Sequence, residues 1–410
     1  MSEIGLASKV KPVTNRSKNF NKRFIVLDGK IQQIPSEIHD LFKTNKPFKP
    51  FLFYLLNDIF TNKLQLQENE DLSVDQFFRL RFGDDIADYL INPICIGITG
   101  GNSEELSIKS VFPNVFLGEQ KHGSVVKSMF FSKTDRFKDL RDDPLVQRSI
   151  REKWLVFSFE GGIGTFSDSL AEFLKNQNTE LSLSNEAKQL KFVNNNSECE
   201  VNGEIFDHIF SSIPAFGLSS ILSAENVQLK EALLEIPFVD MGVVSFKFPA
   251  EVKLPSNMNG FGFLVPSHEN SPVLGVIFDS LIFEDETTSK FTVMLGGYRF
   301  KQLFGPAETV SKDHLIDISR IALSKYLQIS AKPLEIFASV HKKCIPQYNL
   351  GHENRVLRIE QLAQNLPFSL IGSSYRGFSV PDCVYNAKLQ AIDFIERSFN
   401  SETNKYTKVI

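Results

Sequence analysis

Apolar residues recur at three- and four-residue spacing through most of the first 140 residues. The stretch "LSVDQFFRLRFGDDIADYLINPICIGITG" (72–100) has this spacing and is broken by its glycines. Because such spacing places apolar side chains on one face of a helix, it predicts a mainly helical region. A polar, charged connector, "SKTDRFKDLRDDPLVQRSIREK" (132–153), ends this region.

After residue 153 the pattern changes to short apolar and aromatic runs, which are typical of strands. The run "WLVFSF" (154–159) is followed by a glycine turn, "EGGIGT" (160–165), and a helical pattern, "FSDSLAEFLKNQ" (166–177). Further strands are predicted for "TELSLS" (179–184), "KQLKFVN" (188–194) and "FDHIFSSIPA" (206–215).

The segment 236–345 alternates strand-like runs with turns that are rich in glycine, proline and serine. Examples of the runs are "FVDMGVVSFKF", "VLGVIFDS" and "FTVMLGG". A helix is predicted over 311–327, with its apolar side formed by Leu315, Ile318, Ile321, Leu323 and Leu327. The whole pattern indicates an α/β protein with an added helical region.

Composition limits the classes of function that the chain can have. The 410 residues allow two or three domains, and a net charge of −4 argues against a nucleic-acid partner. Four scattered cysteines without a CxxC pair and seven histidines without an HxxH or HxxxH pair give no support for a metal site. The longest apolar stretch, "PFKPFLFYLLNDIF" (47–60), is too short to span a membrane and fits a core helix or an interfacial one.

Side-chain catalysis has little support in the sequence. No nucleophile elbow occurs, and the paired carboxylates lie in charged turns. "EGGIGT" lacks both GxGxxG spacing and a Walker lysine, so it predicts a tight strand-to-helix turn better than a phosphate loop. Either a cofactor supplies the chemistry or the chain has none.

The last predicted helix follows a polar loop, "SSYRGFSVPD" (373–382), and carries small residues at Ala387 and Ala391. One interpretation is an ordinary capped helix. The other is a helix N-terminus whose N–H groups face an anion, such as the N1/O2 edge of a reduced flavin. That effect is worth ~1–2 kcal/mol, or ~20–40 mV for a two-electron couple, so it can tune a flavin only modestly.

Several stretches in order resemble the protoporphyrinogen oxidase family, in its animal mitochondrial form, within the flavin amine oxidase-like superfamily. They include "NKRFIVLDGKIQQIP", "GITGGNSEELSIKSVFPNVF", "FSFEGGIGTFSDSLAE", "NGFGFLVPS", "HKKCIPQYNLGH" and "GSSYRGFSVPDCV", and they cover nearly the whole chain. The resemblance implies three parts: a helical, membrane-associated domain (15–140), a mixed-sheet substrate domain (236–345) and an FAD-binding domain (150–235 and 346–410).

For the cofactor, the resemblance implies non-covalent FAD beneath the final loop and helix. Gly377 would allow close backbone approach, Asp382 would open the helix, and Ala187 would contact the adenine through its backbone. The remaining positions that match flavin contacts are Ser373, Phe378, Ser379 and Val380.

For the substrate, protoporphyrinogen IX, the resemblance implies that Arg23 binds a propionate, for which a guanidinium is well suited. Phe261 and Leu264 would sandwich the macrocycle, Met294 would line the pocket, and the backbone of Gly101 would lie beside the ring. Without the resemblance, these four positions look like ordinary strand core and turn. No side-chain base and no metal are implied.

The implied reaction is three successive two-electron oxidations, with hydride transfer from the macrocycle to flavin N5 and reoxidation by dioxygen to hydrogen peroxide. The implied location is the inner mitochondrial membrane, on its intermembrane-space side, with "FKPFLFYLLNDIF" (48–60) as the candidate contact surface. A homodimer and a contact with ferrochelatase are left open.

The sequence departs from the family at its start, because the expected strand and GxGxxG turn do not occur. The first βαβ unit of the FAD domain is therefore expected to be absent from this chain. Two alternatives stay open at this point: an inactive, truncated isoform or incomplete gene product, and a different flavin amine oxidase.

Overall fold

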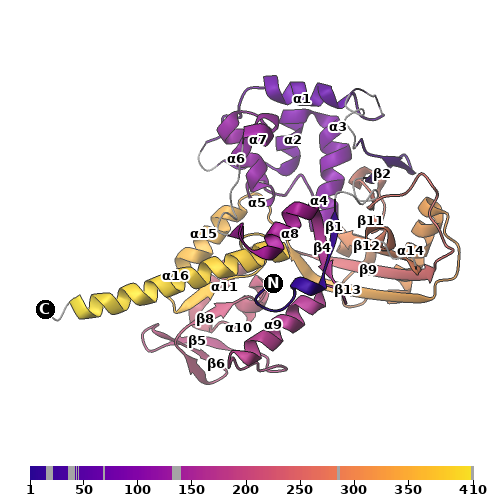
Figure 1. Ribbon diagram of the computed structural model, residues 1–410. Helices are drawn as coiled ribbons and strands as arrows, with labels where there is room; N and C mark the ends of the chain where they lie inside the picture. Colours follow the sequence, from indigo (N-terminus) through magenta and orange to yellow (C-terminus); the bar gives the residue numbers. More distant parts are fainter. Residues whose placement is uncertain are drawn as a thin grey trace.

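The computed structural model describes residues 1–14, 22–35, 42, 44, 46–67, 70–131, 140–283 and 287–407, with side chains up to residue 397. Figure 1 shows helices at the top, a broad sheet at the right, and a mixed region at the lower left from which the C-terminal helix extends. The beginning of the predicted helical domain and residues 132–139 of the predicted connector lie outside the described residues.

A seven-stranded mixed sheet has the order β13-β9-β12-β11-β10-β2-β3. Neighbouring strands are antiparallel except β10 and β2, which run parallel. The strands are β2 (Phe24–Leu27), β3 (Lys30–Gln33), β9 (Phe238–Pro249), β10 (Gly262–Leu264), β11 (Val273–Ile277), β12 (Thr288–Gly297) and β13 (Glu335–Pro346). The helical elements of this region are the 3₁₀ turn Ser267–Glu269, α12 (Asp279–Ile282), α13 (Phe300–Phe304) and α14 (Lys312–Leu327).

Strands β2 and β3 lie within residues 15–140, which are predicted to be mainly helical, and both belong to the seven-stranded sheet. All four residues of β2 are buried, with alternate side chains in the sheet core and in the helical core. Asp28 and Gly29, with φ of 50° and 71°, turn the chain into β3. An Asp-Gly pair is a strong hairpin signal, and the helical interpretation overlooked it.

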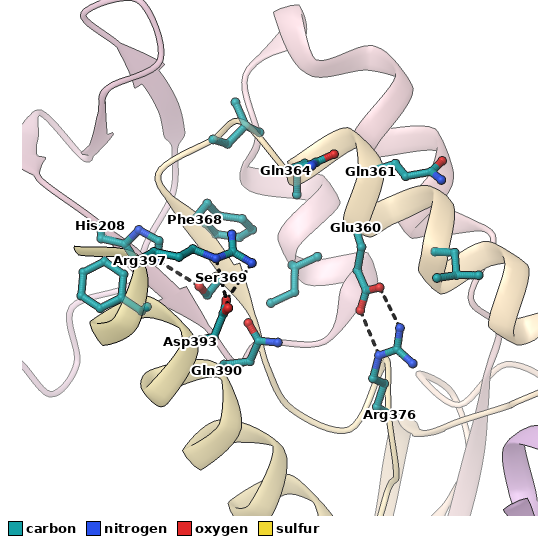
Figure 2. Close-up of a pocket in the computed structure, with 15 residues that line it drawn as sticks. His208, Glu360, Gln361, Gln364, Phe368, Ser369, Arg376, Gln390, Asp393 and Arg397 are labelled. Atoms are coloured by element: carbon teal, nitrogen blue, oxygen red, sulfur yellow. Dashed lines mark hydrogen bonds and ion pairs between the residues drawn. The ribbon is translucent and has the colours of Figure 1, made fainter. Parts of the chain in front are cut away.

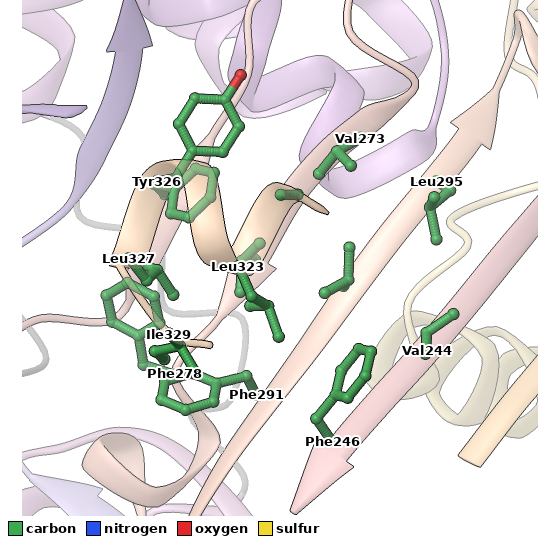
Figure 3. Packing of buried hydrophobic residues seen from close by; sticks show 14 of the residues in the cluster. Val244, Phe246, Val273, Phe278, Phe291, Leu295, Leu323, Tyr326, Leu327 and Ile329 are labelled. Carbon is green, nitrogen blue, oxygen red and sulfur yellow. The ribbon is translucent and has the colours of Figure 1, made fainter. Parts of the chain in front are cut away.

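One face of the sheet forms the largest described core with α14 (Figure 3). Directly opposed residues on five neighbouring strands form a continuous buried row, namely Phe263, Val276, Val293, Val244 and Ala338. Because side chains alternate along a strand, the residues between them face the other side of the sheet, where helix α4 contacts β10 and β11.

Helix α14 confirms the predicted helix over 311–327 and most of its apolar side. Leu315, Leu323 and Leu327 are buried against the sheet, and Ile318 is partly buried there. The assignment of Ile321 to the apolar side is wrong, because its side chain is 66% exposed.

The helical region packs around a second core. Its elements are α1 (Phe51–Phe60), α2 (Val74–Phe82), α3 (Asp84–Ile86), a π-helix (Ala87–Ile91), α4 (Asn92–Thr99), α5 (Ile108–Val111), α6 (Pro113–His122) and α7 (Val125–Phe131). Arg81 of α2 is fully buried and pairs with Asp58 of α1 at 2.6 Å and Glu119 of α6 at 3.3 Å. Since each of these charges is hydrogen-bonded, the cluster fastens three helices together. None of the described helices is long and apolar enough to cross a membrane.

The third region combines segments from before and after the sheet. Its strands are β1 (Val10–Thr14), β4 (Trp154–Phe159), β5 (Leu190–Val193), β6 (Glu198–Val201), β7 (Glu204–Phe206), β8 (Ile209–Ser211) and β14 (Phe368–Leu370), with β8 and β14 parallel. Its helical elements are the 3₁₀ turns Ala7–Lys9 and Ala224–Asn226, α8 (Pro144–Glu152), α9 (Gly164–Asn176), α10 (Ala215–Ile221), α11 (Val227–Leu234), α15 (His352–Ala363) and α16 (Val380–Thr407).

The strand predicted at 179–184 is wrong, because this segment is irregular. A strand needs a neighbouring strand to pair with, whereas every residue of this segment except Leu181 is exposed to solvent. The architecture as a whole is the predicted α/β arrangement with an added helical region.

Candidate functional site

The loop between β14 and α16 carries most of the predicted flavin contacts, and we call residues 371–379 the C-terminal loop. Two buried side chains hold its backbone. The Tyr348 hydroxyl donates to the Ser373 carbonyl at 2.6 Å, and His352 Nε2 bonds the Tyr375 carbonyl at 2.8 Å. Phe378 lies edge-on to Tyr348, with ring centroids 5.4 Å apart. The loop is therefore tied at three points to the segment that leads into α15.

Helix α16 begins at Val380, two residues before the predicted start at Asp382, because Ser379 is its cap. The Asp382 N–H donates to Ser379 Oγ at 3.2 Å, and that hydroxyl donates to the Asp382 carboxylate at 2.6 Å. Pro381 has no N–H, so Val380 supplies the first-turn N–H that a ligand can use. The helix is thus capped, and it offers an anion one first-turn donor instead of several.

The backbone conformation and the contacts of residue 377 within the chain explain why it is glycine. Its φ is 81°, and a Cβ there would lie 2.5 Å from Cβ of Asp382. A side chain would therefore be strained and would also collide with the first turn of α16. The predicted close approach at Gly377 is made by Asp382 in this structure.

A cavity of about 560 Å³ opens beside the C-terminal loop, between α15, the start of α16 and residues 109–115. The predicted flavin residues among its lining are Gly377, Phe378 and Asp382. Burial lowers the pKa of His352 to about 4 and raises the pKa values of Tyr348 and Tyr375. All three side chains are consequently neutral near pH 7.

Ala187 lies in a different segment from the C-terminal loop. It is exposed in the irregular segment before β5, and the Asn202 side chain holds its neighbours through Glu186 O and Lys188 N, both at 2.8 Å. Ala187 therefore lies just before β5, which belongs to the same core as Tyr375. Its contact with adenine stays a prediction.

Two predicted substrate residues from distant parts of the sequence meet at one end of the sheet. The Arg23 guanidinium lies 5.7 Å from the centre of the Phe261 ring. Arg23 is exposed just before β2, and Phe261 is half-buried against Val13 and Ile282. A cation held at the rim of an apolar surface can receive a carboxylate from a flat ligand.

Leu264 and Met294 lie on the same face of the sheet, on either side of Gly275. Leu264 is opposite Gly275, and Gly275 is opposite Met294 in the next pair of strands. We call these three residues the pocket row. Leu264 and Met294 are only partly buried, and a Cβ on Gly97 of α4 would lie 2.6 Å from Leu264 Cδ2. The row therefore lies directly beneath helix α4.

Gly101 is buried where α4 ends, with its N–H on Thr99 Oγ1 at 3.0 Å. A Cβ at this position would lie 2.2 Å from Gln347 Oε1. Gln347, Tyr348 and His352 were not predicted as site residues. The motif that contains them, "IPQYNLGH", was the available signal, because it combines several polar and aromatic residues in a short span.

A second cavity, of about 530 Å³, lies between α15, α16 and β14 (Figure 2). Its charged residues are already paired: Arg376 with Glu360 at 2.7 Å and Arg397 with Asp393 at 2.8 Å. His208 bonds Ser369 at 2.9 Å, and burial lowers its pKa. No cluster of three potential metal ligands occurs in the part of the chain that the structure describes.

Comparisons with known proteins identify the family of this chain. Residues 1–393 match the family model described as flavin containing amine oxidoreductase. The chain is 33% identical to protoporphyrinogen oxidase of Bos taurus, over 98% of this chain and 84% of that protein. It is 31% identical to the Homo sapiens protein of the same name, with the same coverage.

A solved structure from Exiguobacterium sp. 255-15, provisionally described as a protoporphyrinogen oxidase, has a TM-score of 0.74 with this chain. The match covers 97% of this chain and 84% of that one at 21% identity, so it supports the fold. The expected flavin amine oxidase-like fold is thereby confirmed.

Proposed function

We propose that this chain, which belongs to the flavin containing amine oxidoreductase family and within it to the protoporphyrinogen oxidases, catalyses the FAD-dependent oxidation of protoporphyrinogen IX to protoporphyrin IX. Dioxygen is the proposed oxidant and hydrogen peroxide the second product, in the penultimate step of haem biosynthesis. The observation that carries the substrate assignment is the position of Arg23 over Phe261 at the end of the sheet that bears the pocket row.

Arg23, Phe261 and the pocket row divide the binding of a flat tetrapyrrole between them. Arg23 would pair with a propionate, and the apolar surfaces of Phe261, Leu264 and Met294 would contact the macrocycle. Gly101 would let the backbone at the end of α4 approach the ring. Orienting the substrate is the main task left to the protein, since no acid–base group is required.

The flavin of this family would accept two electrons when it is bound, and we assign it as non-covalent FAD. The residues present fit such a group, because the Val380 N–H is available and a cavity opens at Gly377 and Phe378. The N–H and the helix dipole would stabilise negative charge on the ligand by ~1–2 kcal/mol. Ser373 and Ser379 shape this loop through the Tyr348 bond and the helix cap.

We further propose that the helical region rests on the inner mitochondrial membrane, on its intermembrane-space side. Apolar side chains of the neighbouring helices α1 and α7 are exposed, namely Phe53 (53%), Leu56 (43%), Phe60 (80%), Met129 (76%), Phe130 (80%) and Phe131 (70%). Exposed apolar residues on helices that pack together suit a lipid interface. The homodimer and the ferrochelatase contact stay predictions of the resemblance.

Arg23 would also favour the proposed substrate over an amine. A protonated amine would meet a like charge at this end of the pocket, whereas a porphyrinogen propionate would meet an opposite one. The test is to purify the chain with FAD, and then to supply protoporphyrinogen IX or a primary amine aerobically. Flavin binding, porphyrin fluorescence and hydrogen peroxide with protoporphyrinogen alone are expected. A preparation without flavin, or peroxide formed only with the amine, would contradict the proposal.

A further inference from the structure

We propose that the segment from Gln347 to His352 positions the C-terminal loop relative to the substrate pocket, with Gln347 acting at the pocket and Tyr348 and His352 acting at the loop. This inference rests on the proposed function, because it concerns how the same site is held. The three side chains are positioning residues, and each contacts the backbone of an element that carries predicted ligand contacts.

Tyr348 and His352 bind the loop at alternate carbonyls. The Tyr348 hydroxyl donates to Ser373 O at 2.6 Å and His352 Nε2 bonds Tyr375 O at 2.8 Å. The two rings are stacked, with centroids 3.8 Å apart and planes at 15°. Because the rings support each other, the two carbonyls are held as a pair at a fixed spacing.

The bonds have only one chemically consistent direction. A backbone carbonyl can only accept, so Nε2 of His352 must carry the proton. Its Nδ1 is buried without a partner among the described residues. His352 is 2% exposed and Tyr348 is 1% exposed. A 180° flip of the ring about its Cβ–Cγ bond would place Cε1 where Nε2 lies and remove the hydrogen bond to Tyr375 O, so the loop selects one orientation of the ring.

The other end of the segment reaches the substrate side. Gln347 Nε2 donates to Thr99 O at 2.9 Å, and Gln347 Oε1 occupies the space that a Cβ on Gly101 would need. Gln347 is 5% exposed. The backbone also contributes, because Ser107 N donates to Tyr348 O at 2.8 Å.

Adjacent residues of one short segment therefore contact both halves of the site. Movement of the segment would displace the end of α4 and the C-terminal loop together, so their separation is preserved. Transfer between two bound groups depends steeply on their separation, and a misplacement of about 1 Å can cost ~100-fold in rate. The segment is thus placed to set that separation.

Four substitutions at three positions test the two ends. Tyr348→Phe removes only the hydroxyl and keeps the stacked ring. His352→Leu removes the Nε2 donor, whereas His352→Gln keeps an N–H at nearly the same distance from the backbone. Gln347→Leu removes the bond to Thr99. Tyr326→Phe is the matched control, because Tyr326 is also a buried tyrosine (7% exposed), with its hydroxyl 3.2 Å from Lys325 Nζ in the sheet core.

The first readout is hydrogen–deuterium exchange of residues 371–379 in the chain without added flavin. Tyr348→Phe and His352→Leu should speed exchange of this loop about tenfold, as expected for the loss of one buried hydrogen bond. His352→Gln should restore most of the protection, and Tyr326→Phe should leave it unchanged. Equal loop exchange in wild type, Tyr348→Phe and His352→Leu would overturn the inference.

The second readout separates positioning from general stability. Tyr348→Phe and His352→Leu should weaken FAD binding about tenfold, while Gln347→Leu should lower kcat and leave the FAD Kd unchanged. FAD binding that matches wild type in both loop variants would overturn the inference and leave the proposed function standing. If wild-type chain binds no FAD, the proposed function fails first and the inference fails with it.

Discussion

The two faces of the seven-stranded sheet show how one set of strands serves both folding and binding. On the face toward α14, opposed residues of five strands form a dry row of Phe263, Val276, Val293, Val244 and Ala338. On the other face, Leu264 and Met294 are partly exposed and Gly275 lies between them. Successive residues of one strand therefore face different surroundings. A Cβ at Gly275 would lie 2.9 Å from Leu264 Cδ2, so the glycine lets Leu264 lie close against the sheet.

The largest effect is expected from truncation on the core face. Phe263 is 2% exposed and contacts the rings of Phe278 and Tyr326. Phe263→Ala should lower the free energy of unfolding by about 3–5 kcal/mol, because it removes buried apolar surface and leaves a cavity. Urea unfolding followed by circular dichroism measures this change. A loss below about 1 kcal/mol would mean that this face is not the principal core.

Acid should act next most strongly, through the buried His352 that binds the C-terminal loop. Its pKa is held near 4 by burial, with the charges of Arg355 and Arg376 also opposing protonation. The unfolded chain takes up the proton first, so the stabilisation is complete above pH 6.5 and is lost as the pH falls toward 4. The loss amounts to about 3 kcal/mol.

Urea unfolding at several pH values measures this acid effect. His352→Gln should show a flatter stability profile between pH 6.5 and 4, because glutamine does not titrate. Profiles that run parallel for wild type and the variant would show that His352 titrates normally in the folded chain.

Arg23→Met should raise KM for protoporphyrinogen about 10- to 100-fold, since a charge-assisted hydrogen bond contributes about 1.5–3 kcal/mol. Arg23→Lys should recover part of that loss, because it keeps the charge but lacks the planar fork. Thermal stability should change little, as Arg23 is exposed. An unchanged KM in Arg23→Met would remove this residue from the site.

A smaller stability effect than that of Phe263→Ala is expected at the next residue, on the opposite face. Leu264→Ala should cost only about 1–2 kcal/mol, because its side chain is half-buried. Its effect on KM should nevertheless exceed that of Phe263→Ala, measured with the folded fraction of each variant. A larger stability loss for Leu264→Ala than for Phe263→Ala would reverse the assignment of the two faces.

The sequence predicted the regular parts of the fold because their signals are local. The alternating pattern in residues 238–248 and the helical spacing in 311–327 are properties of neighbouring residues. The hairpin at Asp28 and Gly29 was locally readable but was overlooked within a helical region. The strand at 179–184 was overpredicted, because suitable residues alone do not create a strand without a partner.

The site was less predictable because its contacts are not local. Nothing near Arg23 in the sequence indicates that its guanidinium meets Phe261, and the resemblance alone grouped them. The C-terminal loop is held by Tyr348 and His352, whose side chains bond carbonyls of residues that follow α15 and β14 in the sequence. The start of α16 was predictable in part. A serine three residues before an aspartate is a capping signal, and it indicates that the N–H of the aspartate is hydrogen-bonded to the serine.

The central claim is that a tetrapyrrole on the pocket row transfers electrons to a flavin held at the C-terminal loop. The most direct measurement mixes the FAD-loaded chain with protoporphyrinogen IX anaerobically and follows the absorbance of the bound flavin. We predict that one two-electron oxidation of the substrate bleaches the oxidised flavin, and that Arg23→Met slows this bleaching at low substrate concentration. A flavin that stays oxidised in the presence of excess protoporphyrinogen would contradict the account.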